Sequence, residues 1–382
     1  MTVAGEIIIS VVVENTNIRS LQINSTRSTR ITELFANKTI SEVEQNINLL
    51  FQLCNTAHRF SFLQLLNKNQ LIKLSDNELL SYRLLLDIET IKEHCFSIAS
   101  KWNRDKTIDK NVVAVLTVLN KIKERLFSGG DGLSLASKQL NDFSAIAPFI
   151  DELDNRLHDF LLGGKYCERH VFSSDDSFKD WVQTGETKSA DFFKYLQQHK
   201  LSNLGATKIQ PLPLKVAKEL SHLLKDQKFI CRPNYQNVIY ESTPFSRLKK
   251  HSLIEKLGNG IVGRYVAQLV EIFVLLNKIK RDYKNMQSEI ISYNIKTSST
   301  SKSALVCVEA ARGKLIHQTK IKKNQIVDYQ ILSPTQWNFH PQGVLNTMIK
   351  ALTFSDKHDL KRKISLLVVA LDPCVGCNVI VK

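Results

Sequence analysis

The stretch Asp372-Pro-Cys-Val-Gly-Cys377 places two thiols at C-x-x-C spacing directly after a strongly apolar run at 364–371. The apolar run predicts a β-strand, which would carry both thiols into the protein interior. In such a place thiolates hold metals rather than meet solvent. Two cysteines on one turn supply half of a tetrahedral site, so the remaining ligands must come from distant parts of the chain.

The composition is that of a globular protein. Of the 382 residues, 43% are hydrophobic, which is enough for the core of one large domain or of two ordinary ones. No apolar run reaches the length of a membrane span, and the N-terminus shows no secretory signal. Seven scattered cysteines are an odd number, which predicts reduced thiols rather than a disulfide framework. We therefore expect a cytoplasmic protein without a membrane anchor.

The formal net charge of +15 favours an acidic partner such as nucleic acid, an anionic surface or an acidic protein. The basic clusters at 249–250, 278–281, 320–323 and 357–363 are dispersed along the chain. No helix-turn-helix or zinc-finger pattern surrounds them, and they are typical of turns and of polar helix faces. We therefore expect no nucleic-acid binding.

Hydrophobic periodicity predicts a single α+β domain over residues 1–382, with a mainly helical centre and small β-sheets near the N- and C-terminal ends. Residues 1–40 should form a β-hairpin followed by a loop. Residues 41–300 should be largely helical. Residues 301–382 should be rich in strands and carry the C-terminal cysteine pair.

The same patterns predict the individual elements. The capping-box spacing of Ser41 and Glu44 should open a helix that carries Cys54 near its end. Residues 163–212 are polar and predict irregular structure. The remaining expectations are helices at 79–102, 112–127, 145–162, 214–224, 262–283 and 344–352, and strands at 7–13, 18–23, 305–308, 314–321 and 326–332.

Two further groups of residues have the spacing of metal ligands. Cys54 and His58 are four residues apart on an apolar helical face, so both can point into the interior. A buried cysteine beside a histidine is also ordinary core packing, and the spacing alone leaves both interpretations open. Cys167 and His170, with His158 upstream, lie in a polar segment without a second close pair, and we interpret them as incidental. The chain contains no H-E-x-x-H, G-x-S-x-G or G-x-G-x-x-G motif of a familiar hydrolase or dehydrogenase.

Several stretches, in chain order, resemble the motifs of the large subunit of nickel-iron hydrogenases. The C-terminal Asp-Pro-Cys-x-x-Cys is similar to the last motif of that family, and residues 305–377 are the specific part of the resemblance. The other matching stretches are Leu53-Cys-Asn-Thr-Ala-His58, Tyr240-Glu-Ser-Thr-Pro-Phe-Ser-Arg247, Glu309-Ala-Ala-Arg-Gly-Lys-Leu-Ile-His317 and the segment 324–338, which ends in Ser-Pro-Thr-Gln-Trp-Asn. The resemblance implies a large-subunit-like fold.

The resemblance also shows what this chain lacks. In that family two C-x-x-C pairs hold a nickel-iron centre, and the second cysteine of each pair bridges the two metals. Cys54 and Cys377 match the bridging positions. Cys374 matches one nickel-only position, but Phe51 stands where the other nickel-only thiolate belongs.

Two more residues of the family pattern are replaced. The proton-transferring glutamate near the N-terminus aligns with Ala4, and the histidine or arginine that follows the last cysteine aligns with Ile380. The resemblance therefore implies that hydrogen turnover is impaired or absent.

An iron fragment could still bind. The resemblance implies that Cys54, Cys374 and Cys377 hold an Fe(CN)2CO unit, because low-spin iron that carries cyanide and carbon monoxide requires soft thiolate ligands. Nickel binding is not expected, because Phe51 removes one of its ligands. The residues that the resemblance places around the iron unit are His58, Arg312, Pro334 and Thr335.

The complete pattern resembles the hydrogenase maturation proteins of the HupK and HoxV type. It implies a non-catalytic scaffold that holds the Fe(CN)2CO unit transiently and passes it to the hydrogenase large subunit. The implied partners are the large-subunit precursor and the assembly chaperones that deliver iron. No cleavable extension follows the last cysteine, which suits a carrier that must release its cargo. Two alternatives stay open: a divergent hydrogenase large subunit or hydrogen sensor, and a metal-free docking protein for assembly chaperones.

Overall fold

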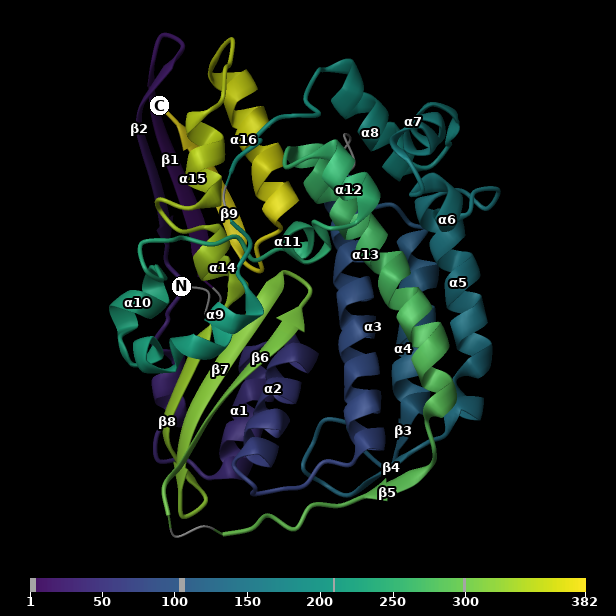
Figure 1. Cartoon of the computed structure of the whole chain (residues 1–382), viewed down its shortest axis with the longest axis vertical. Helices are drawn as coiled ribbons and strands as arrows, with labels where there is room; N and C mark the ends of the chain where they lie inside the picture. Colours follow the sequence, from purple (N-terminus) through teal and green to yellow (C-terminus); the bar gives the residue numbers. More distant parts are fainter. Residues whose placement is uncertain (1–4, 103–106, 209, 298–299) are drawn as a thin grey trace.

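The structure combines a group of long helices with three small sheets (Figure 1). This computed structural model describes residues 5–102, 107–208, 210–297 and 300–382. No helix within those residues is both long and apolar enough to span a membrane. The α+β class predicted from the sequence is confirmed.

Both ends of the chain meet in one sheet (Figure 1). Strand β1 (Glu6–Glu14) pairs antiparallel with β2 (Asn17–Ser25) and parallel with β9 (Gly376–Val381). Alternate side chains of β1 are buried, as expected for a strand with one face on the core. The predicted N-terminal hairpin is confirmed, and its first strand also holds the segment that carries the C-terminal cysteines, with Ile7 opposite Cys377.

A second sheet consists of the antiparallel strands β6 (Lys302–Ala310), β7 (Gly313–Lys322) and β8 (Gln325–Leu332), as the sequence predicts. The turn between β6 and β7 requires Gly313, whose φ is +132°. A Cβ atom at this position would lie 2.0 Å from the carbonyl oxygen of Ser242. The close approach brings the β6–β7 turn, with Arg312 in it, against the segment that contains Ser242.

The central helices pack beside this sheet. Helix α3 (Asp76–Lys101) contacts α4 (Val112–Leu126) and α13 (Ile261–Asp282), and α4 contacts α5 (Ala147–Leu161). The three-stranded sheet of β3 (Phe127–Ser128), β4 (Lys138–Leu140) and β5 (Glu289–Ile291) joins the ends of these helices and was not predicted from the sequence. The other elements are η1 (Ile31–Phe35), α1 (Ile40–Leu50), α2 (Asn55–Lys68), η2 (Phe143–Ala145), α6 (Glu168–Val171), α7 (Asp175–Thr184), α8 (Lys188–Gln198), α9 (Leu214–Glu219), η3 (Leu220–Lys225), α10 (Gln227–Cys231), α11 (Pro244–Leu248), α12 (Ser252–Leu257), η4 (Tyr283–Asn285), α14 (Pro334–Asn338), α15 (Val344–Lys350) and α16 (Lys357–Leu371).

The strand predicted at 364–371 is wrong, because this run is the second half of helix α16. Asp356 caps the helix by accepting the backbone N–H of Asp359, and the helix therefore begins seven residues before the apolar run. Leu360, Ile364 and Leu367 are buried at helical spacing. The β-branched residues near the end of α16 resemble a strand only when the capped polar turn before them is left out.

Two other local predictions are also wrong. Residues 163–212 contain helices α6, α7 and α8. Ser174 caps α7 and Thr187 caps α8, and the aromatic side chains of these two helices are buried. The capping box of α1 is formed by Thr39 and Glu42, not by Ser41 and Glu44. Helix α1 ends at Leu50, so Cys54 does not lie near the end of that helix but stands just before α2.

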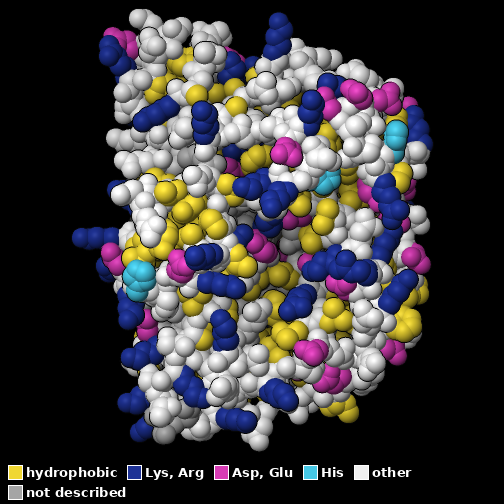
Figure 2. Space-filling view, in the orientation of Figure 1, with side chains coloured by type: hydrophobic (Ala, Val, Ile, Leu, Met, Phe, Trp, Pro, Cys, Tyr) yellow, Lys and Arg dark blue, Asp and Glu magenta, His cyan; other side chains and the backbone are white. Residues whose placement is uncertain are grey.

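Charged side chains are spread over the surface. On the face seen in Figure 2, Lys and Arg side chains alternate with apolar and acidic ones and do not gather into a continuous stripe. The most deeply buried Arg–carboxylate pair among the described residues is that of Arg264 in α13, which donates to both carboxylate oxygens of Glu241, at 3.2 and 2.7 Å. Only 1% and 2% of these two side chains are exposed, so each charge depends on the other.

Replacing Arg264 by methionine should destabilise the protein by about 3–5 kcal/mol, because the Glu241 carboxylate would remain buried without its partner. Urea unfolding followed by circular dichroism measures this loss. The Arg281→Met variant, which breaks an exposed ion pair with Asp282, is the matched control and should unfold close to the wild type. Equal unfolding midpoints for the two variants would contradict the assignment.

Candidate thiol site

Cys54 and Cys374 line one cavity of about 380 Å³. Cys54 lies at the start of α2, and Cys374 lies in the turn between α16 and β9. The rest of the lining is mainly apolar and comes from Arg27, Ser28, Ile31, Val375 and residues 49–53. The structure thus brings together two thiols that are 320 positions apart in the sequence.

Two polar side chains contact the thiol of Cys374. Arg27 Nη1 donates to Cys374 Sγ at 3.2 Å and also to Ser333 Oγ at 3.3 Å. The hydroxyl of Thr335 lies 3.4 Å from the same sulfur. Thr335 was expected here from the resemblance, and Pro334 before it is the first residue of α14 and is buried. Arg27 was not expected, because it lies in a polar loop that carries no motif.

Arg312 lies beside both thiols and is held by two carboxylates. Its Nη2 donates to Glu93 at 3.1 Å, and its Nε lies 3.3 Å from Asp372 Oδ2. Burial opposes the charge of Arg312, but Asp372, Glu93 and then the two thiols raise its pKa. Burial likewise opposes the charge of Asp372, but Arg312 and Lys101 lower the pKa of this carboxyl. Arg312 therefore presents a permanent positive charge to Cys54 and Cys374.

The thiol of Cys54 is protonated at neutral pH in this arrangement. Burial raises its pKa most, and the negative charges of Cys374 and Glu89 raise it further, while Arg312 and Arg27 act in the opposite direction. Glu89 accepts the backbone N–H groups of Thr56 at 2.7 Å and Ala57 at 3.1 Å, at the first turn of α2. Burial raises the pKa of Glu89 to about 7.

A buried chain of rings lies behind Cys54. The rings of Phe51 and His58 are stacked, with centroids 3.7 Å apart and planes 8° apart. His58 Nδ1 lies 2.9 Å from His317 Nε2, and His317 Nδ1 lies 2.8 Å from the hydroxyl of Tyr329. Burial lowers the pKa of His58 and lowers that of His317 to about 3, so both imidazoles are neutral. Phe51 thus fills a space with an apolar ring at the position where the family pattern has a thiolate.

Cys377 lies in different surroundings from the other two thiols. It is a half-buried residue of β9, and its pKa is raised to about 11 by burial and then by Glu6. Across the described ranges, no three His, Cys, Asp or Glu side chains form a cluster that could hold a metal ion. The expected metal ligation by Cys54, Cys374 and Cys377 therefore stays a prediction, and the structure joins only the first two in one cavity.

The other residues singled out in the sequence lie elsewhere. His158 contacts Glu168 at 2.9 Å, and Cys167 donates to the same carboxylate at 3.3 Å, so their neighbours are carboxylates rather than further thiols. The position of Ala4 lies outside the described residues. Ile380 is a half-buried residue of β9.

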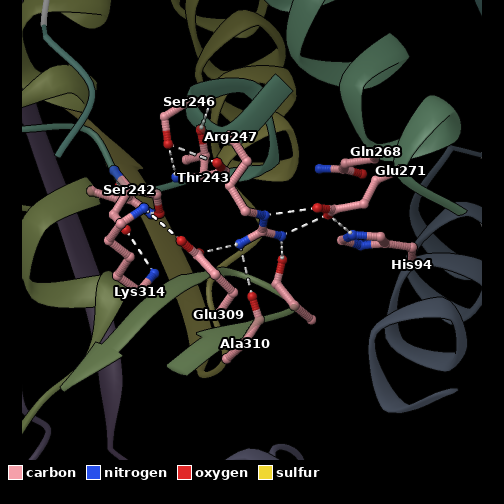
Figure 3. Close-up of polar contacts among 12 residues, drawn as sticks. His94, Ser242, Thr243, Ser246, Arg247, Gln268, Glu271, Glu309, Ala310 and Lys314 are labelled. Atoms are coloured by element: carbon pink, nitrogen blue, oxygen red, sulfur yellow. Dashed lines mark hydrogen bonds and ion pairs between the residues drawn. The ribbon is translucent and has the colours of Figure 1, made fainter. Parts of the chain in front are cut away.

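A polar network fixes the turn that presents Arg312 (Figure 3). Arg247 of α11 donates to both oxygens of Glu271 at 2.7 and 2.6 Å. Its other donors reach the backbone carbonyls of Ala310 at 2.9 Å and Ala311 at 3.0 Å, directly before Arg312. His94 of α3 contacts Glu271 at 2.8 Å from the other side. The network therefore ties the β6–β7 turn to two central helices.

Part of the chain is similar in sequence to known proteins. Residues 236–380 match the family model of nickel-dependent hydrogenases. Over 163 residues the chain is 31% identical to the hydrogenase expression/formation protein HoxV of Cupriavidus necator, covering 41% of this chain and 42% of the relative. Over 178 residues it is 26% identical to the protein HupK of Rhizobium leguminosarum bv. viciae, covering 45% and 47%. Parts of the chain are therefore similar in sequence to nickel-dependent hydrogenases and to hydrogenase expression/formation proteins. It spans less than half the length of these curated relatives.

Solved structures with a similar fold cover nearly all of the chain. The Ni-Fe-Se hydrogenase from Desulfovibrio vulgaris Hildenborough superimposes with a TM-score of 0.68 at 17% identity, covering 96% of this chain and 95% of that one. The Ni-Fe-Se hydrogenase from Desulfomicrobium baculatum gives 0.67 at 14% identity, covering 96% of each chain. The chain therefore has the fold of a nickel-iron hydrogenase large subunit, as the sequence motifs imply.

The Glu89→Gln variant should lose the pH dependence that this carboxyl imposes on stability. The pKa of Glu89 is 4.5 in an ordinary setting and about 7 in the folded protein, so the folded state binds more protons between these values. Wild-type stability should fall by about 2–3 kcal/mol relative to the variant as pH rises from 5 to 7. Urea unfolding at several pH values measures this difference. Glu255→Gln, at an exposed position in α12, should keep the wild-type profile, and a Glu89→Gln profile identical to it would refute the assignment.

Proposed function

We propose that this chain is a non-catalytic accessory protein of nickel-iron hydrogenase maturation that carries an Fe(CN)2CO unit as cargo. The observation that carries the proposal is the pair of thiols, Cys54 and Cys374, that lines one cavity together with Arg27 and that also lies within the electrostatic influence of Arg312. Two thiolates are the soft ligands that low-spin iron requires. The names of the matched relatives, hydrogenase expression/formation proteins, support a role in assembly.

The chemistry of the cavity suits a cargo that is bound and then released. Cys54 must lose its proton to bind iron, and burial raises the pKa of this thiol, so iron binding would release a proton and would weaken as the pH falls. Arg312 and Arg27 stabilise the thiolates that form. The same guanidinium groups and the hydroxyl of Thr335 are the donors that cyanide nitrogen atoms would accept from.

The nickel half of a catalytic centre has no place to form here. Phe51 supplies an apolar ring that is 6% exposed and stacked on His58, where a nickel-bound thiolate would be needed. We therefore infer that nickel does not bind and that hydrogen is not turned over. The partners that fit this role are the precursor of the hydrogenase large subunit, which accepts the iron unit, and the iron-delivering assembly chaperones. We place this exchange in the reducing cytoplasm.

Infrared spectroscopy of protein purified anaerobically with its maturation machinery should show cyanide and carbonyl bands. The bands should vanish in the Cys54→Ser and Cys374→Ser variants, because each removes one thiol from the cavity. Cys377→Ser tests the third expected ligand, and retained bands in that variant would assign the cargo to the two facing thiols alone. Cys167→Ser, at an exposed and distant thiol, is the matched control and should keep the wild-type spectrum.

Two outcomes would change the proposal. If the purified wild-type protein contains no iron and shows no cyanide or carbonyl bands, the chain would instead be a docking protein that never holds the cargo. One nickel per chain with hydrogen oxidation would instead make the chain a divergent hydrogenase.

The Phe51→Cys variant should gain nickel binding, because it restores a third thiol three residues before Cys54. Metal analysis after growth with nickel measures the gain. Loss of the stacked ring should also destabilise the protein by about 2–4 kcal/mol. Phe51→Ala is the matched control, since it loses the same ring without adding a thiol, and equal nickel content in both variants would refute the assignment of this position.

A further inference from the structure

A second cavity, of about 270 Å³, lies on the other side of Arg27 from the thiols. Its polar lining consists mainly of Arg27, Thr29, Cys231, Arg232, Thr335 and Gln336. Ile7 of β1 and Phe339 after α14 supply an apolar wall. Thr29 Oγ1 lies 3.2 Å from Cys231 Sγ, and this contact joins the loop after β2 to α10 across the rim. Arg27 and Thr335 face this cavity and also contact Cys374.

The two arginines of this cavity have no carboxylate to balance them. Within the described part of the chain, no ion pair is formed by Arg27 or Arg232. In contrast, Arg247, Arg264 and Arg312 each face at least one carboxylate. No Asp or Glu is among the residues that line the cavity. The cavity is therefore a concave surface with two positive charges and no negative one.

The charge of Arg232 affects the pKa of His340. Burial lowers the pKa of His340 and the charge of Arg232 lowers it further, while a hydrogen bond with the backbone of Arg232 acts in the opposite direction. Because no Asp or Glu lines the cavity, Arg27 and Arg232 can both offer positive charge and N–H donors to a ligand.

We propose that this cavity binds a small oxyanion, a phosphate or a carboxylate, between Arg27 and Arg232. Guanidinium groups bind such planar or tetrahedral oxyanions through paired N–H donors, and the hydroxyls of Thr29 and Thr335 add further donors. An organic group attached to the oxyanion would pack against the apolar side chains of Ile7 and Phe339. This cavity is separate from the cavity proposed for the cargo, but Arg27 lines both. A bound oxyanion would compete for the N–H donor of Arg27 that otherwise reaches the thiol of Cys374.

The thiol of Cys231 provides a direct test, because it is exposed and lines the cavity. The full-length, iron-free protein is treated with iodoacetamide, and alkylation of each cysteine is followed by mass spectrometry of its peptide. Inorganic phosphate should slow alkylation of Cys231 at least threefold relative to sodium chloride of equal ionic strength. The exposed thiol of Cys167, which lies at the start of the distant helix α6, serves as the internal reference and should not change.

The Arg232→Gln variant should lose this protection, and it should weaken phosphate binding measured by calorimetry at least tenfold. Arg232 is exposed, so the variant is expected to fold, and circular dichroism checks this. Lys228→Gln, in helix α10 just before Arg232 but outside the cavity lining, should bind phosphate like the wild type.

A parallel arm distinguishes the two sources of the oxyanion. A short peptide with a free C-terminal carboxylate is compared with the same peptide as its amide. Protection by phosphate alone would indicate a free phosphate ligand, and protection by the peptide acid alone would indicate a carboxylate supplied by a protein partner. Cys231 rates that are equal in chloride, phosphate and both peptides would overturn the proposal. Because the assay uses iron-free protein, its failure would leave the iron-carrier proposal untouched, and the reverse also holds.

Discussion

The buried ion pair between Arg312 and Asp372 is the interaction on which the thiol site depends. Arg312 lies in the turn between β6 and β7, and Asp372 ends helix α16 immediately before the turn with Cys374. Asp372 has a φ of 42°, a conformation that the chain adopts at the end of this helix and that redirects it toward β9. Ser97 donates to Asp372 at 3.0 Å and Lys101 also pairs with it, so α3 supports the same point. One carboxylate therefore connects the second sheet, a central helix and the cysteine turn.

The site balances two opposing effects on its sulfur atoms. Burial favours the neutral thiol of Cys54, whereas the nearby guanidinium groups favour the thiolate. The guanidinium groups do not offset burial completely, because Arg312 also pairs with Glu93 and Asp372 and Arg27 also donates to Ser333. A metal fragment that replaces the proton would remove the cost of the buried charge.

Much of the fold could be predicted from local patterns. The β-branched run at 7–13 indicates strand β1, and the long amphipathic stretches at 79–102 and 262–283 indicate helices α3 and α13. The apolar run at 364–371 was assigned to a strand because eight residues rich in β-branched and aliphatic side chains fit both structures. Asp356, which starts the helix, lies outside that run. The helices within 163–212 were missed because few apolar residues mark them and their caps carry the signal.

By itself, the sequence determined the family of folds, the identity of the thiols and the loss of one thiol at Phe51. These are properties of residue type and order, and they need no knowledge of distance. Only the tertiary structure decided that Cys54 and Cys374 line one cavity while Cys377 lies in a strand, and that Arg27 contacts the sulfur of Cys374. No local pattern predicts these contacts, because they join segments hundreds of residues apart through the pairing of β1 with β9 and the ion pairs of Arg312. Long-range packing sets which functional groups meet, whereas the sequence sets which groups are available.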